Sequence, residues 1–250
     1  MRGAKLLVLG LVGCGRLNFD PDSRDAAVDR GLLLHVDFED GFVDTVGGRP
    51  VTCLGTCPSI VPGPLGMAAS LFSDDCLVIE DDPALQSPIY SFSAWFNPHT
   101  GNEVENLLGR TLDSETGGAN TFELGYETGE LAVYGGGVSV RVPAALDTWH
   151  HAAGVLTGSR LRGYLDGVTF GEVAATPQLV AGQAFRIGCD RDNATDLFFL
   201  DAELDDIRLY GRELDDAEIA ALAALPFFGG ATAPNLGTVP NLGGATAPNP

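Results

Sequence analysis

Positive charge is scarce in this sequence. The 250 residues include 14 Lys and Arg against 34 Asp and Glu, a formal net charge of −20 at pH 7. Lys5 is the single lysine. Such a surface repels phosphate backbones and anionic lipid headgroups, so we expect no nucleic-acid partner. The acidic balance is compatible with bound Ca²⁺, and it is equally what keeps an exported protein soluble.

Long hydrophobic runs are missing as well. The apolar run at residues 6–12 is too short to cross a bilayer as a permanent helix. Preceded by Arg2 and Lys5, it has the form of an export signal. It ends in Leu11-Val12-Gly13-Cys14, which resembles the lipobox of bacterial lipoproteins. The alternative is an ordinary signal peptide followed by a chance cysteine.

The lipobox resemblance implies that residues 1–13 are a lipoprotein signal peptide and that Cys14 carries a lipid that anchors the protein in a membrane. Gly15 follows the cysteine, where an Asp would suggest retention in the inner membrane. We therefore expect a protein of the bacterial cell envelope, at the outer membrane or cell surface.

Cysteine is sparse. Besides Cys14, the chain contains Cys53, Cys57, Cys76 and Cys189. An even number in an exported chain indicates two disulfides, for which three pairings are possible. We favour Cys53–Cys57, a local bridge, with Cys76–Cys189 joining distant strands. A zinc site is disfavoured because an oxidising compartment removes free thiolates and no His stands at ligand spacing.

One domain is expected over residues 31–226. Helical periodicity is nearly absent between about residues 31 and 212, where short apolar segments alternate with turn residues. Two tight turns are expected, at residues 157–160 and 166–167. We predict strands over residues 32–38, 77–80, 89–96, 105–109, 122–126, 131–134, 138–142, 150–156, 162–165, 168–173, 185–187, 197–199 and 203–210. The fold class is therefore all-β, a two-sheet jelly-roll sandwich.

One short C-terminal helix is predicted over residues 216–225. Asp215 can cap it, Glu218 completes a capping box, and Pro226 ends it. Outside the domain, residues 14–30 form a flexible acidic spacer. Residues 227–250, in which residues 229–235 recur as 243–249, have no periodic apolar face, and we expect a disordered tail.

Five segments occur in an order that resembles the laminin-G-like domains of the concanavalin-A-like lectin/glucanase superfamily. They are residues 32–39, 67–74 and 90–96, the hairpin that follows Trp149, and the strand 203–210 with its helix. The resemblance implies a concanavalin-A-like binding module, often for carbohydrate, in which Ca²⁺ is common but not universal.

Catalytic signatures are missing. The sequence contains no Gly-x-Ser-x-Gly elbow. His150 and His151 are neighbours on a strand and point to opposite faces, one towards the core and the other towards the surface. Glycoside hydrolases of this fold carry Glu-x-Asp-x-x-Glu, whereas the stretch from Glu203 places Arg208 where the second catalytic carboxylate belongs. The sequence therefore predicts a protein that is not an enzyme.

Two kinds of ligand site are candidates. Asp37, Asp40 and Asp44 follow the first strand, and Asp205 and Asp206 lie in the last one. First and last strands are commonly neighbours in a sandwich, so these residues are candidate ligands of one structural Ca²⁺. Solvated acidic turns, including the oxygen-rich stretch at residues 190–196, are the alternative. Candidate sugar platforms are Tyr126, Tyr134 and Tyr164.

These patterns together predict a surface-displayed binding module whose partner is a glycan or another cell-surface polymer, as in carbohydrate binding or adhesion. One alternative is a structural or protein–protein interaction module of the envelope. A glycoside hydrolase is the less favoured second alternative.

Overall fold

The structure is a computed structural model, which describes residues 28–101, 104–110, 120–179, 181–192 and 195–225. The predicted leader, Cys14, the spacer up to residue 27 and the tail from residue 227 lie outside these residues. The chain separates into two units, residues 1–30 and 31–250, and the fold described here belongs to the second. Among the described residues, no helix is both long and apolar enough to span a membrane.

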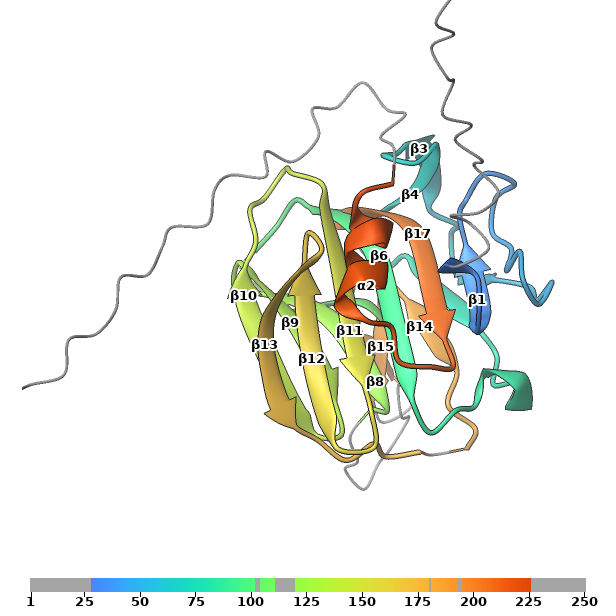
Figure 1. Cartoon of the computed structure of the whole chain (residues 1–250). Helices are drawn as coiled ribbons and strands as arrows, with labels where there is room; N and C mark the ends of the chain where they lie inside the picture. Colours follow the sequence, from blue (N-terminus) through green and yellow to red (C-terminus); the bar gives the residue numbers. More distant parts are fainter. Residues whose placement is uncertain (1–27, 102–103, 111–119, 180, 193–194, 226–250) are drawn as a thin grey trace, which may run out of the picture. The chain divides into compact units, whose positions relative to one another are not determined.

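One layer of the fold is an eight-stranded antiparallel sheet (Figure 1). Seven strands follow the order β13-β12-β11-β6-β17-β4-β3, and β1 pairs with β17 beside them. The sequence-based expectation that the first and last strands are neighbours is confirmed. The strands are β1 (Leu32–Val36), β3 (Ser59–Pro62), β4 (Met67–Leu71), β6 (Tyr90–Pro98), β11 (His150–Leu156), β12 (Arg160–Leu165), β13 (Val168–Ala174) and β17 (Ala202–Tyr210).

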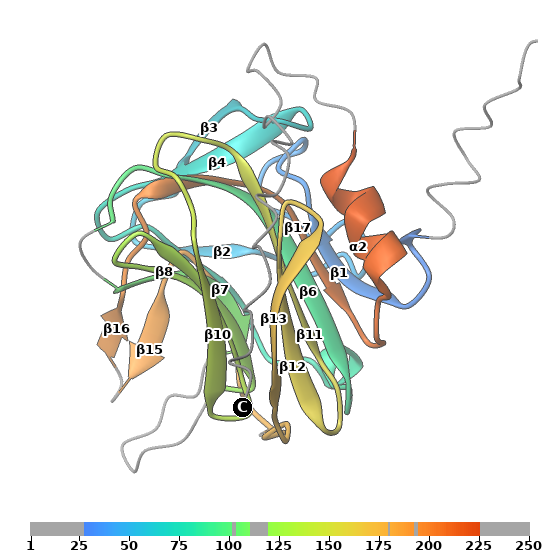
Figure 2. The same cartoon turned by 60° about the vertical axis from the view of Figure 1, so that its left-hand side comes forward.

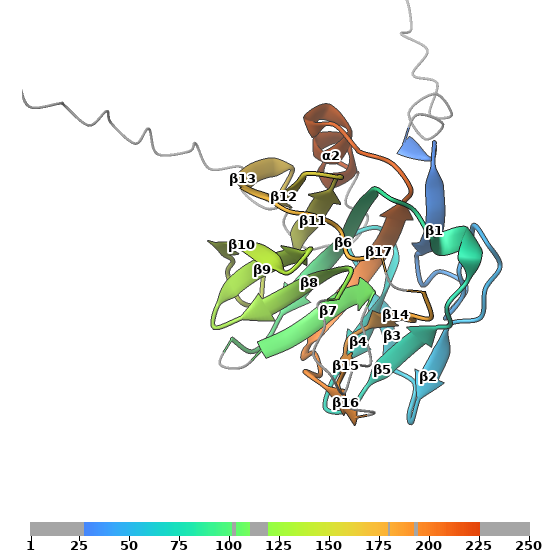
Figure 3. The same cartoon turned by 90° about the horizontal axis from the view of Figure 1, so that it is seen from below.

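The second layer is a seven-stranded antiparallel sheet in the order β10-β9-β8-β7-β14-β5-β2. Its strands are β2 (Thr52–Leu54), β5 (Cys76–Ile79), β7 (Val104–Arg110), β8 (Phe122–Glu127), β9 (Glu130–Gly135), β10 (Val138–Pro143) and β14 (Phe185–Ile187). A two-stranded ribbon, β15 (Asp190–Asp192) with β16 (Thr195–Leu197), and a short 3-10 helix, η1 (Pro83–Leu85), complete the set. Figure 3 shows the two layers one above the other, with β11 and β6 in the upper layer and β9, β8 and β7 in the lower one.

The core lies between the inner faces of the two sheets. Phe92 of β6 stacks on Phe122 of β8 with ring centroids 4.4 Å apart, and Tyr90 lies 4.9 Å from the same ring. Phe92, Ala94 and Phe96 all belong to this cluster, as the alternation in the sequence predicts. Each buried Phe contributes about 2 kcal/mol of hydrophobic free energy, so the aromatic layer holds the sheets together.

The turns of the predicted hairpins form as expected. The Thr157 amide donates to the Arg160 carbonyl at 2.9 Å. Asp166 and Gly167 both have positive φ, 50° and 79°, which is the conformation that a two-residue turn between twisted strands requires. A Cβ on Gly167 would also lie 3.1 Å from the Ala220 Cα atom, so this turn packs directly against the C-terminal helix.

That helix, α2 (Asp216–Ala223), begins at the predicted capping box, in which Asp215 accepts from the Glu218 amide and Glu218 from the Asp215 amide. It ends two residues before the predicted Leu225. Ile219 and Leu222 are buried, and α2 lies on the outer face of the eight-stranded sheet against β11 and β13 (Figure 1).

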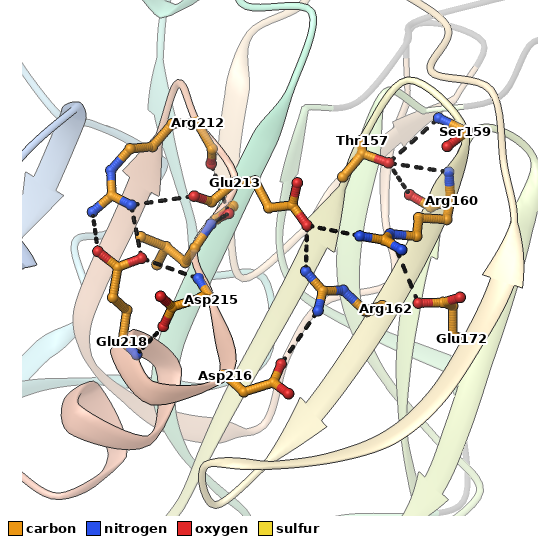
Figure 4. Close-up of polar contacts among 12 residues, drawn as sticks. Thr157, Ser159, Arg160, Arg162, Glu172, Arg212, Glu213, Asp215, Asp216 and Glu218 are labelled. Carbon is orange, nitrogen blue, oxygen red and sulfur yellow. Dashed lines mark hydrogen bonds and ion pairs between the residues drawn. The ribbon is translucent and has the colours of Figure 1, made fainter.

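A polar network surrounds the start of α2 (Figure 4). Arg160 and Arg162 of β12 both reach Glu213, the latter at 2.6 Å, and Arg162 also reaches Asp216 at 3.2 Å. Arg212 pairs with Glu218 at 2.8 Å. Exposed ion pairs each contribute at most about 1 kcal/mol. The network therefore fixes the direction of the helix, and the buried apolar residues supply most of its stability.

Both favoured disulfides, Cys53–Cys57 and Cys76–Cys189, are present.

The sequence-based prediction was less complete for short strands. It missed β2 and β3, and it assigned residues 67–74 to no strand, although β4 begins at Met67. It expected a strand at residues 197–199, whereas the ribbon β15–β16 covers residues 190–197. Apart from β4, the missed strands have only three or four residues, too few for alternation to be a reliable signal.

Candidate functional site

The predicted calcium ligand Asp44 is fully buried and organises its own loop. Its carboxylate accepts from the backbone amides of His35, Val46 and Gly47, each at 3.1 Å, and from Arg49 Nη1 at 2.6 Å. Four donors satisfy most of the lone pairs of a carboxylate. Asp44 therefore closes the turn after β1 by hydrogen bonds within the protein.

Asp205 and Asp206 lie at a bulge in β17, where the register with β6 shifts and Asp206 has a φ of 49°. Such a bulge aims neighbouring side chains in new directions. Asp206 Oδ1 lies 2.7 Å from His35 Nε2 and accepts from Arg208 Nε at 2.9 Å. Burial raises the pKa of Asp206, but these two partners outweigh it and hold the pKa at about 2.

Asp205 has the opposite character. Burial raises the pKa of its carboxyl to about 7, although the Leu65 amide donates to it at 3.0 Å. Asp37 accepts from the Glu39 amide at 3.2 Å, and Asp40 is exposed. Within the described residues, no group of three or more His, Cys, Asp or Glu is placed to hold a metal ion. The structure does not bring the five predicted ligands together, and calcium binding stays a prediction.

Two of the three predicted sugar platforms are wrong. Tyr126 and Tyr164 are both 0% exposed. The Tyr126 hydroxyl donates to the Ala144 carbonyl at 2.8 Å, and the Tyr164 hydroxyl donates to Asp216 at 2.8 Å. A buried ring cannot stack on a sugar. Tyr134 is only partly buried and stays a candidate.

The two adjacent histidines also differ from expectation, because both are buried. His150 lies 2.9 Å from Asp166 through Nδ1, so it is not a surface residue. His151 is 0% exposed and contacts the edge of Trp95 on the outer face of the eight-stranded sheet. Burial lowers the pKa of His151 to about 4, so this imidazole is neutral at physiological pH.

A polar row crosses the outer face of the seven-stranded sheet. Strand register places Gly109, Glu123, Tyr134 and Ser139 side by side on β7, β8, β9 and β10. Glu127 and Arg141 lie beside the row, where Arg141 pairs with Glu127 and the Tyr134 hydroxyl bonds to Glu127. The Arg141 guanidinium lies 5.4 Å from the centre of the Tyr134 ring. We call these residues, with Asn106, Asn120 and Asp190, the polar face.

The ribbon β15–β16 forms one wall of the polar face. Figure 2 shows the ribbon beside β7 and β8. Asn120 joins the two parts, because its Nδ2 donates to Glu123 Oε2 at 2.9 Å and to Asp190 Oδ2 at 3.0 Å. Asp190 is 5% exposed. The carboxyl groups of Glu123, on β8, and Asp190, on the ribbon, therefore bind the same Asn120 amide nitrogen.

The electrostatics of the polar face are dominated by Glu123. Burial and the negative charge of Asp190 raise the pKa of its carboxyl to about 8, with smaller contributions from Glu127 and Asp192. Glu123 is therefore mostly protonated at neutral pH, and it can donate a hydrogen bond as well as accept one. Burial, followed by the bond to Glu127, also raises the pKa of the Tyr134 hydroxyl.

Sequence reasoning missed the polar face except for Tyr134 and for Asp190, which it placed only in an oxygen-rich acidic stretch. The only local signal is the alternation in Phe122–Glu127, which puts Glu123 and Glu127 on the face opposite the core residues Phe122 and Leu124. Nothing in the sequence indicates that Asp190 folds next to Asn120, 70 residues away.

The model of the family described as the concanavalin A-like lectin/glucanases superfamily matches residues 73–220. The chain belongs to this superfamily. A comparison with curated protein sequences gave no significant match.

Several solved structures share the fold. Domain 4 of AbnA, a GH43 extracellular arabinanase from Geobacillus stearothermophilus determined with arabinotriose, is 19% identical with a TM-score of 0.60, over 77% of this chain and 98% of that one. Trypanosoma rangeli sialidase is 17% identical with a TM-score of 0.61, over 78% and 32% of the two chains. A structure of botulinum neurotoxin type C, whose cell entry depends on interaction with two ganglioside molecules, is 10% identical with a TM-score of 0.60, over 80% and 52% of the two chains.

In this member of the concanavalin A-like superfamily, the hydrolase-like stretch of β17 is held by internal partners. Glu203 Oε2 accepts from Asn97 Nδ2 at 2.9 Å and lies 2.8 Å from His99 Nε2. His99 Nδ1 lies 2.9 Å from Asp147. Burial lowers the pKa of His99, but these two carboxylates outweigh it and raise the pKa. Glu203 therefore belongs to an ion-paired cluster.

Proposed function

We propose that this protein is a non-catalytic carbohydrate-binding or adhesion module, displayed at a bacterial surface by a lipid on Cys14, and that the polar face holds the glycan. The observation that carries the proposal is the row formed by Glu123, Tyr134 and Ser139 on the outer face of the seven-stranded sheet. In a superfamily of lectins and glucanases, a sheet face that presents carboxyl, hydroxyl and guanidinium groups together suits a polyhydroxylated ligand.

The geometry supports binding more than hydrolysis. Double displacement by a retaining glycosidase needs a nucleophile and an acid across one sugar. In β17, Arg208 neutralises Asp206 at 2.9 Å, and Glu203 is bound to His99 and Asn97. Carboxylates that are already paired within the protein are poorly placed to attack or protonate a sugar. We therefore propose that Glu203 and Asp206 of β17 have a structural role.

Specific groups of the polar face are suited to sugar hydroxyls. Glu123 is partly buried, so its carboxyl is held in place yet open to a ligand from the outer side. Arg141 is exposed and presents its planar guanidinium above Tyr134. Gly125 contributes no side chain, and a Cβ there would lie 3.6 Å from the Tyr134 ring. The glycine therefore keeps space open in front of the aromatic residue.

The test is a glycan array probed with the full chain, with and without EDTA, followed by titration calorimetry on each hit. Tyr134→Ala is expected to weaken binding at least about tenfold, because it removes the ring and the support of Arg141. Phe72→Ala is the matched control, since Phe72 is an aromatic residue on a loop and is 66% exposed. An array that stays silent in both conditions would reject the proposal in favour of a structural or protein–protein module.

A further inference from the structure

The polar face contains a buried acceptor that has no donor. Asn106 of β7 is 0% exposed and lies opposite Gly125 on the outer side of the sheet. Its Nδ2 donates to the Cys189 carbonyl at 2.9 Å, but its Oδ1 has no hydrogen-bond partner among the described residues. A buried amide oxygen without a donor costs free energy, which a ligand hydroxyl at this point would recover.

The carboxyl groups beside Asn106 already accept hydrogen bonds, including one from the Arg191 amide to Asp190 Oδ1 at 2.6 Å. Asn120 provides one amide nitrogen to both Glu123 and Asp190. Asp190 directly follows Cys189, whose carbonyl accepts from Asn106 Nδ2 at 2.9 Å, so Asn106 and Asp190 belong to the same part of the polar face. A carboxylate only accepts hydrogen bonds. A ligand group that approaches Asn106 Oδ1 and Asp190 must therefore be a hydrogen-bond donor, as the hydroxyl groups of a sugar are.

The arginines near the polar face are already paired with carboxylates. Arg141 pairs with Glu127, and Arg186 and Arg191 reach Asp196 at 2.9 and 3.2 Å. Recognition of an acidic sugar normally uses an arginine that meets the ligand carboxylate or sulfate. Here Asp190 would repel an anionic ligand, and that ligand could pair with an arginine only by displacing Glu127 or Asp196.

We propose that the polar face selects neutral glycans, which donate hydroxyl groups to Asn106 and Asp190, and that it rejects sialylated, uronic and sulfated glycans. The inference rests on the proposed glycan-binding function and specifies its ligand class. It separates this protein from the sialidase bound to 2,3-difluorosialic acid and from the neurotoxin that interacts with gangliosides, although the fold is shared.

The experiment pairs neutral glycans with acidic counterparts that differ by one anionic group, such as lactose with sialyllactose, and xylo-oligosaccharides with glucuronoxylo-oligosaccharides. The full chain is titrated with both members of each pair that the array identifies. We expect the neutral member to bind at least about tenfold more tightly, since like-charge contact opposes binding of the other. High salt is expected to reduce the difference, because it screens the charges.

Asp190→Asn tests which residue causes the discrimination. It removes the charge and keeps the shape and one accepting oxygen, so the difference within each pair should shrink, mainly because the acidic member binds more tightly. Asp74→Asn, on an exposed loop, is the matched control and should leave the difference unchanged. Equal or tighter binding of the acidic member would overturn this inference and leave the proposed function standing. Binding of no glycan at all would overturn both.

Discussion

The raised pKa of Glu123 predicts that Glu123→Gln stabilises the protein, and increasingly so as the pH rises. The carboxyl has a pKa of about 8 in the folded state against an ordinary value of 4.5. Below pH 4.5 it is protonated in both states and contributes no difference. Between pH 4.5 and 8 the carboxyl ionises in the unfolded chain but not in the folded protein, so the free energy of unfolding falls by about 1.4 kcal/mol per pH unit. At pH 7 the accumulated loss is about 3 kcal/mol.

This figure is an upper value, because the Glu123 side chain is only partly buried and solvent screens part of the effect. The assay is urea denaturation of the wild type and Glu123→Gln at pH 4.5, 6, 7 and 8.5. The two free energies of unfolding should agree at the lowest pH, diverge in favour of Gln up to pH 8, and then run parallel. Glu80→Gln, at an exposed position, should show no such divergence. A difference that stays constant with pH would refute the reasoning.

Further predictions concern packing and cross-links. Gly154→Ala should destabilise the fold by about 3 kcal/mol in thermal or urea unfolding, because its Cβ would lie 2.3 Å from the Phe92 ring. Gly158→Ala, with nothing within 4 Å, should cost less than about 1 kcal/mol, and equal losses would contradict this packing. Replacing the Cys76–Cys189 pair by Ala should cost about 4 kcal/mol, and replacing Cys53–Cys57 clearly less, because the bridges span 113 and 4 residues. Melting temperatures that fall equally would argue against the loop-entropy explanation.

The sequence predicted features that depend on neighbouring residues. The turn at Asp166-Gly167, the capping box of α2 and the local Cys53–Cys57 bridge each follow from a few adjacent side chains. The many short strands indicated two packed sheets, and the resemblance to the superfamily implied their concanavalin-A-like arrangement. With the fold known, the pairing of first and last strands followed.

The parts that could not be predicted depend on distant contacts. Alternation shows which residues share a face of the strand with Tyr126, but both faces of a sandwich strand can carry aromatic residues. Only the assembled core shows that the face with Tyr126 is the buried one. The bulge at Asp206 turns a predicted metal ligand towards His35 and Arg208. The meeting of Glu123 with Asp190 depends on a ribbon of three-residue strands that carries no recognisable pattern.

The position of β17 has a consequence for how this domain is made. This strand lies between β6 on one side and β4 with β1 on the other, so it occupies the interior of the eight-stranded sheet although it is the last strand in the chain. Until residues 202–210 leave the ribosome, β1, β3 and β4 have no link to the rest of that sheet. No N-terminal fragment that stops short of β17 can complete the eight-stranded sheet, so this domain can fold only after residue 210 has been synthesised.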